Sequence, residues 1–135
     1  MILDGKNIVM GRLSTEVAKK LLKDEEVTII NAEKVIITGN KTSIVEKYLK
    51  MRDVGSQKNG PFFPRAPDRI LRRTIRGMMP YKTRKGKAAM KKLSVVIGTP
   101  EEYVDKDVKK VAEKPIKTSF VYLGEVSKTI GWVNG

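Results

Sequence analysis

The chain has 135 residues, of which 40% are hydrophobic, and this length predicts a single domain spanning residues 1–135 around one core. It carries 28 Lys and Arg against 15 Asp and Glu, a formal net charge of +13, so we expect a polyanionic partner. The sequence lacks cysteine and histidine and has no apolar segment long enough for a transmembrane helix. We therefore expect no metal, no cofactor, no membrane contact and a cytoplasmic location.

The first half of the chain alternates short extended segments with helices. β-Branched or apolar runs predict strands over residues 2–3, 27–30 and 35–38, and an extended piece over residues 7–10. Apolar residues at helical spacing predict helices over residues 12–22 and 40–51. In the second helix, Ile44, Val45, Tyr48 and Leu49 are expected to face inward.

The second half begins with a loop over residues 55–67, marked by two glycines and three prolines. Helices are predicted over residues 68–79, with Asp68 as N-cap, and over residues 83–93. A buried strand over 94–97, a final strand over 119–123 and a short helix over 124–130 complete the chain. Strands that alternate with helices predict an α/β fold, in which helices cover a mostly parallel sheet.

The positive charge is concentrated in one part of the sequence. Residues 61–92 carry 11 basic side chains and one acidic side chain, whereas residues 93–135 carry six of each. Solubility is served well by mixed charge and does not require this imbalance. The segment is therefore the best candidate for contact with a polyanion.

The helix predicted over residues 68–79 carries the clearest pattern. At 100° per residue, Leu71, Ile75 and Met78 fall on one side, and we expect them to face the sheet. On the other side, four arginines spaced i, i+3, i+4 and i+7 form a stripe, namely Arg69, Arg72, Arg73 and Arg76. A solvated helix face is the alternative interpretation, but the lack of acidic partners and the planar guanidinium favour phosphate contacts with RNA.

Two positions beside this stripe leave alternatives open. Gly77 either takes a positive φ that turns the chain, or permits close approach of RNA or another helix. The adjacent aromatics Phe62 and Phe63 either stack on an unpaired base or plug the edge of the core.

Further basic residues extend the predicted surface on both sides of the stripe. Arg65 precedes it, and a basic loop and helix follow it, with Lys82, Arg84, Lys85, Lys87, Lys91 and Lys92. A separate candidate is the strand-to-helix turn at Gly11-Arg12, which either presents a guanidinium and backbone N–H groups to a phosphate or simply starts a helix.

No arrangement of residues points to catalysis, so we predict that the chain is not an enzyme. Two alternatives to a structural RNA-binding protein remain. One is a free regulator that binds DNA or messenger RNA, although no helix-turn-helix or RNA-reading signature is present. The other is a small α/β enzyme for an anionic substrate, with Arg76 and Lys82 as phosphate clamps.

The segment from Arg72 to Pro80, RRTIRGMMP, resembles the hallmark of the large ribosomal subunit protein thirteen family, in its archaeal and eukaryotic branch. Matching segments run in order along nearly the whole chain: Met10-Gly11-Arg12-Leu13, Asn31-Ala32-Glu33, Ile37-Thr38-Gly39-Asn40, Arg65-Ala66-Pro67, Lys82-Thr83-Arg84-Lys85-Gly86 and Phe120-Val121-Tyr122-Leu123-Gly124. The long basic C-terminal extension of eukaryotic members is not matched, so an archaeal-type protein is expected.

The resemblance implies a three-layer α/β/α fold with a four-stranded parallel sheet. It implies a place on the outer surface of the large subunit, in contact with ribosomal RNA and neighbouring ribosomal proteins and without a small-molecule substrate. It also places the RNA contacts of the family on the helices predicted over 68–79 and 83–93. Together with the charge pattern, this gives the predicted RNA-binding set Arg12, Arg65, Arg69, Arg72, Arg73, Arg76, Lys82, Arg84, Lys85, Lys87, Lys91 and Lys92.

Overall fold

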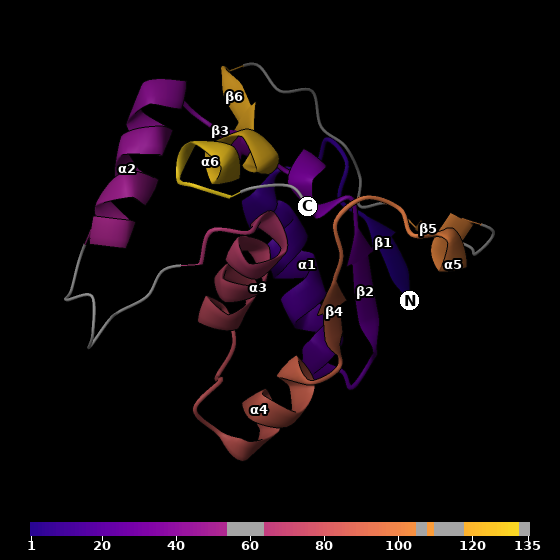
Figure 1. Ribbon diagram of the computed structural model, residues 1–135. Helices are drawn as coiled ribbons and strands as arrows, with labels where there is room; N and C mark the ends of the chain where they lie inside the picture. Colours follow the sequence, from indigo (N-terminus) through magenta and orange to yellow (C-terminus); the bar gives the residue numbers. More distant parts are fainter. Residues whose placement is uncertain (54–63, 105–107, 110–117, 133–135) are drawn as a thin grey trace.

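The computed structural model describes residues 1–53, 64–104, 108–109 and 118–132, and within them a four-stranded parallel sheet forms the centre of the fold (Figure 1). Its strands are β1 (Ile2–Asp4), β2 (Val27–Ile30), β4 (Leu93–Val95) and β5 (Val108–Lys109), in the order β4-β2-β1-β5. Leu3, Val27 and Ile29 are buried in it, as expected for the inner strands of a parallel sheet. The prediction of a four-stranded, mostly parallel sheet is confirmed.

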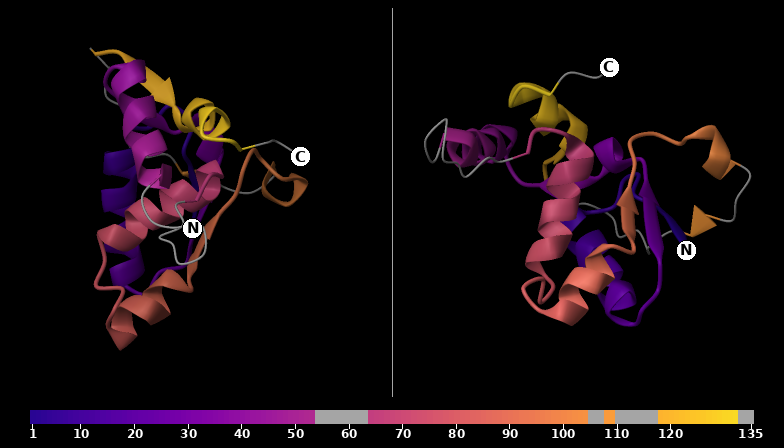
Figure 2. Two further views of the ribbon diagram at one scale, coloured as in Figure 1. Left: turned by 60° about the vertical axis from the view of Figure 1, so that its left-hand side comes forward. Right: turned by 60° about the horizontal axis from the view of Figure 1, so that its bottom comes forward.

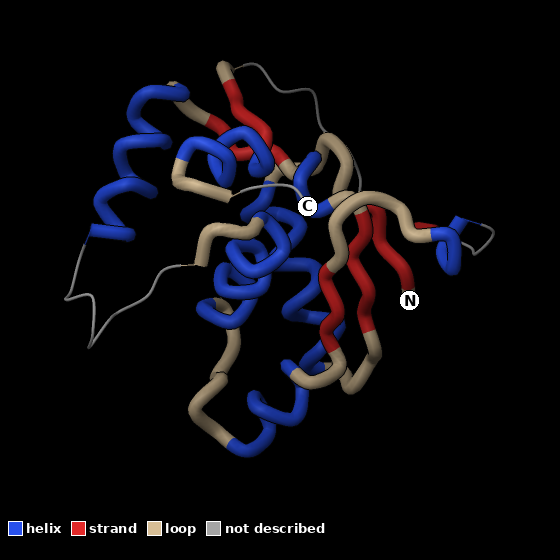
Figure 3. Tube along the Cα trace, viewed as in Figure 1, coloured by secondary structure: helices blue, strands red, loops and turns tan. Residues whose placement is uncertain are grey.

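A second sheet lies apart from the first (Figure 3). In it, β3 (Ile36–Thr38) pairs antiparallel with β6 (Phe120–Tyr122), which joins segments about eighty residues apart along the chain. The extended piece predicted over residues 7–10 supplies one bridge, from Val9 to Ile36, before the first helix begins at Met10.

Helices cover the four-stranded sheet in a three-layer α/β/α arrangement. The steps from β1 to β2 and from β2 to β4 run the same way along the sheet, so right-handed crossovers put α1 (Met10–Leu22), α3 (Pro67–Gly77) and α4 (Arg84–Met90) on one face. The step back from β4 to β5 places α5 (Glu101–Val104) on the other face. Helices α1 and α3 pack together, with Leu13, Val17, Leu71 and Ile75 fully buried.

The remaining elements form a small group beside the second sheet. The helix α6 (Leu123–Thr129) contacts the short 3-10 helix η1 (Ala32–Lys34) and α2 (Lys41–Asp53). Figure 2 shows α2 standing out from the body on the side away from the four-stranded sheet. Ile44 and Tyr48 are buried, but Leu49 is 39% exposed, so its predicted inward position was wrong. A helix that packs along one narrow stripe cannot bury neighbours 100° apart equally well.

Several predicted boundaries need correction. Ala66 is the N-cap of α3 and Pro67 its first residue, so Asp68 lies in the first turn and is not the cap. The predicted helix 83–93 ends at Met90, because Leu93 already begins β4. The predicted buried strand 94–97 is shorter and less buried, since β4 ends at Val95 and Ser94 is exposed. Among the described residues, no helix is long and apolar enough to cross a membrane.

Candidate nucleic-acid interface

The helix α3 separates its apolar and basic side chains as the sequence predicts, with one exception on each side. Leu71 and Ile75 are buried, whereas Arg69, Arg73 and Arg76 are exposed. Met78 was expected to face the sheet but is 45% exposed, because α3 ends at Gly77 and Met78 lies beyond its last turn. Its sulfur accepts a hydrogen bond from the Thr15 hydroxyl of α1, at 3.8 Å.

Arg72 is the exception on the basic side. It is half-buried, and its Nη1 and Nη2 atoms donate to the carbonyl oxygens of Leu93 and Met90, at 2.8 and 3.0 Å. The Leu93 carbonyl lies at the start of β4. The Met90 carbonyl lies at the end of α4, where the last carbonyl groups of a helix have no intrahelical partners. Arg72 therefore fastens α3 to the α4–β4 connection, a role that the helical spacing alone did not indicate.

We expect Arg72→Gln to lower the free energy of unfolding by about 2 kcal/mol, because two hydrogen bonds from a charged donor are lost at a half-buried position. Arg69→Gln is the matched control, since it removes the same charge from an exposed position on the same helix. Urea denaturation of both variants measures the difference. Equal stability of the two would show that the Arg72 contacts contribute nothing.

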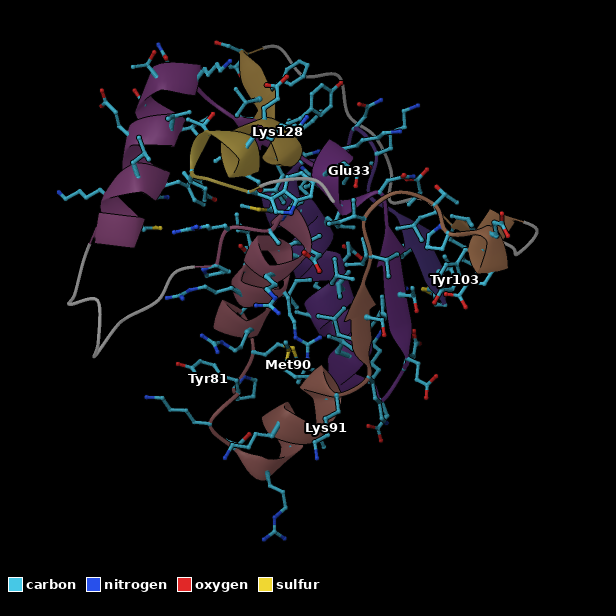
Figure 4. All side chains as sticks on the ribbon, in the orientation of Figure 1. Glu33, Tyr81, Met90, Lys91, Tyr103 and Lys128 are labelled. Atoms are coloured by element: carbon cyan, nitrogen blue, oxygen red, sulfur yellow. The ribbon has the colours of Figure 1, made fainter. Side chains whose placement is uncertain are left out.

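The connection between α3 and α4 is a tight turn held by Thr83. The Thr83 backbone N–H and hydroxyl both donate to the Pro80 carbonyl, at 3.0 and 2.7 Å, and the hydroxyl accepts from the Gly86 N–H at 3.1 Å. Thr83 is thus the N-cap of α4. The Arg76 guanidinium lies over the ring of Tyr81, 5.0 Å from its centre, and Figure 4 shows Tyr81 beside this turn. The basic loop, which is the turn between α3 and α4 that carries Lys82, is therefore ordered by local contacts.

Most of the other predicted residues are exposed along this region. We call the following set the basic surface: Arg65, Arg69, Arg73, Arg76, Lys82, Arg84, Lys85, Lys87 and Lys91. Figure 4 shows Met90 and Lys91 at the end of α4 nearest the sheet, with nitrogen-tipped side chains reaching outward from both α3 and α4. The residues of the basic surface therefore all belong to α3, α4, the turn between them and the residues that directly flank these two helices.

Besides Arg72, two predicted residues stand outside the basic surface. Lys92 forms an ion pair with Asp24 of the α1–β2 turn, in which its Nζ donates a hydrogen bond to Asp24 Oδ1 at 2.8 Å. This hydrogen bond and the positive charge of Lys92 lower the pKa of the Asp24 carboxyl. Arg12 is exposed in the first turn of α1, a different helix, and stays a separate prediction. Phe62 and Phe63 lie outside the described residues, as does most of the predicted loop 55–67.

Comparison with known proteins shows the family of the chain. The family described as Ribosomal protein L13 matches residues 1–102, which is most of the chain. The chain belongs to this family. Its relatives include the large ribosomal subunit protein uL13 of Methanosphaera stadtmanae, 48% identical, and that of Methanococcoides burtonii, 46% identical, each matched over 96% of both chains. The uL13 of Methanopyrus kandleri is 44% identical over 97% of this chain and 86% of its own.

The match confirms the resemblance seen in the sequence, including its archaeal type, since these relatives are archaeal proteins. It also decides against the small α/β enzyme, because the L13 family is one of structural, non-enzymatic ribosomal proteins. The matched region includes α3, α4 and their turn, so the basic surface lies within the part of the chain that defines the family.

Proposed function

We propose that the protein is a structural constituent of the large ribosomal subunit in the cytoplasm, and that it binds ribosomal RNA through the basic surface. The observation that carries the proposal is the excess of positive charge on this surface: residues 61–92 have a net charge of +10, and nine of their eleven cations are exposed. Relatives named large ribosomal subunit protein uL13 support the ribosomal setting. Neighbouring ribosomal proteins are the other expected partners.

The chemistry of the surface suits RNA backbone. Exposed arginines on α3 offer forked donors that match phosphate oxygens, and lysines of the turn and α4 add point charges. Contacts of this kind position a protein on RNA without reading its sequence, as expected for a protein that recognises one folded RNA by shape. The proposed role is therefore to hold RNA segments in place during subunit assembly and translation.

Sedimentation with ribosomal subunits tests this proposal. Labelled protein is mixed with large subunits washed free of their own copy by salt, and with small subunits as the control. We expect saturable binding of one copy per large subunit and none to small subunits. A free regulator of DNA or messenger RNA would instead remain in the supernatant, and that result, or equal binding to both subunits, would contradict the proposal.

Gly77 offers a further prediction at the edge of the basic surface. Its backbone does not have a positive φ, and a Cβ added to it meets no atom within 4 Å, so the interpretation that it must turn the chain was wrong. The other interpretation was close approach of RNA or another helix, and we propose RNA as the partner. We expect Gly77→Ala to leave stability unchanged or raise it by up to about 1 kcal/mol, while weakening incorporation into large subunits. A variant that is less stable without RNA would contradict this account.

A further inference from the structure

Tyr81 is an exposed aromatic side chain among the residues of the basic surface. It is 37% exposed and lies in the turn between α3 and α4 (Figure 4). Met78 and Pro80 of the same turn are exposed as well. Single exposed apolar side chains are common on proteins, but here three of them lie between cations that precede and follow them along the chain. Such a combination of aromatic, apolar and basic side chains is typical of surfaces that bind bases as well as phosphates.

The backbone holds the Tyr81 ring in a defined position. The Tyr81 N–H donates to the Met79 carbonyl at 2.8 Å, and the Thr83 hydroxyl donates to the Pro80 carbonyl at 2.7 Å. The helix α4 packs directly on this backbone, because a Cβ on Gly86 would lie only 3.0 Å from the Tyr81 Cα. An aromatic side chain has two torsion angles, so on a fixed backbone it loses little conformational entropy when a ligand binds.

Arg76 supports the ring from one side. Its guanidinium carbon lies over the Tyr81 ring, 5.0 Å from the ring centre. Because the guanidinium occupies one face of the ring, a planar ligand can stack only on the opposite face. A nucleobase there would complete a stack of guanidinium, ring and base, in which both contacts of the ring are favourable.

The charge around Tyr81 favours a nucleobase over an apolar side chain of another protein. Arg76 precedes the ring and Lys82 and Arg84 follow it, and all three are exposed. An unpaired base brings the phosphates on either side of its sugar, and these cations lie next to the ring in the chain and can meet them. An apolar protein segment would bring no negative charge to this position.

We propose that Tyr81 stacks on one unpaired base of the ribosomal RNA, with Arg76 on the other face of its ring. The proposal rests on the function proposed above and deepens it. The cations of the basic surface attract the RNA backbone over many phosphates, which a regular duplex also offers. The ring instead requires a place where a base is unpaired, and so restricts where on the RNA the protein binds.

Binding of transcribed large-subunit ribosomal RNA by Tyr81→Leu and Tyr81→Phe tests the stack. We expect Tyr81→Leu to weaken binding about tenfold, the effect of one lost base–aromatic contact, and Tyr81→Phe to bind as the unchanged protein does. The slope of log affinity against log salt should stay the same in Tyr81→Leu, because stacking releases no counterions. Phe120→Leu is the matched control, since Phe120 is similarly exposed, at 41%, but lies outside the basic surface.

A double-mutant cycle separates stacking from a purely supporting role. If Tyr81 only orients Arg76 toward a phosphate, Tyr81→Leu should have no effect once Arg76 has been changed to Gln. We expect the loss of about tenfold in the Arg76→Gln background too. Ultraviolet cross-linking of the unchanged protein to the same RNA, read by mass spectrometry, should find a nucleotide attached to Tyr81.

The outcomes separate the stack from the proposed function. If Arg76→Gln weakens binding but Tyr81→Leu does not, in either background, the stack is overturned and RNA binding by the basic surface stands. A loss in Tyr81→Phe equal to that in Tyr81→Leu would also overturn it, because the hydroxyl group would then make the contact. The same holds if Tyr81 in intact large subunits cross-links to a neighbouring protein. No saturable RNA binding by the unchanged protein would instead contradict the proposed function. Circular dichroism checks that each variant is folded.

Discussion

Replacing Arg69, Arg73 and Arg76 together with Gln is expected to weaken binding to large-subunit ribosomal RNA by roughly 100-fold or more. A charge-assisted contact with phosphate contributes about 1 kcal/mol or more, and about 1.4 kcal/mol corresponds to a factor of ten in affinity. The melting temperature should change little, because the three side chains are exposed and their mutual repulsion is removed. Arg72 is left unchanged in this variant because it is bonded within the fold.

A matched control separates the position of the charges from their number. Lys19, Lys41 and Lys50 are exposed on α1 and α2, outside the basic surface, and changing them to Gln lowers the net charge by the same amount. Filter binding at fixed ionic strength compares the two triple variants. If both lose affinity equally, total charge governs binding and the location of the basic surface is irrelevant.

Gly86→Ala is expected to lower the free energy of unfolding by about 3 kcal/mol or more, the largest effect on stability that we predict. A Cβ at this position would overlap the carbonyl oxygen and carbon of Pro80 and would lie 3.0 Å from the Tyr81 Cα. All three are backbone atoms, so the added methyl group can be accommodated only if the turn between α3 and α4 moves. That movement also breaks the Thr83 cap and displaces the basic loop.

Gly77→Ala and Gly11→Ala are the controls for this change. Both glycines lie in helices, and a Cβ on either meets no atom within 4 Å. Urea denaturation should therefore show a large loss of stability for Gly86→Ala alone. A Gly86→Ala variant as stable as the controls would mean that the turn relaxes freely, and that the basic loop is not held as we describe.

The sequence predicted the parts of this fold that depend on local patterns. The helical spacing of Leu71 and Ile75 gave the buried face of α3, and the β-branched run at Val27 gave an inner strand. The concentration of charge in residues 61–92 predicted a basic surface, and nine of the eleven cations in this segment are exposed, whereas RNA binding by this surface stays a prediction. Such features succeed because period and composition report directly on which side chains are buried.

The features that the sequence did not reveal depend on contacts between distant segments. Arg72 and Lys92 belong to the same basic run as their neighbours, but one bonds to Met90 and Leu93 and the other to Asp24. No local pattern distinguishes these two cations from the exposed ones. The need for Gly86 has the same origin, since it follows from where Pro80 lies after the chain has turned.

The salt dependence of RNA binding tests the central claim most directly, that the basic surface binds through phosphates. For roughly 6 to 10 phosphate contacts, affinity should fall about 1000-fold or more between 50 and 200 mM salt. In the Arg69, Arg73 and Arg76 triple Gln variant, the slope of log affinity against log salt should be smaller by about two to three. A nearly flat dependence for the unchanged protein, or the same slope in the variant, would contradict the account.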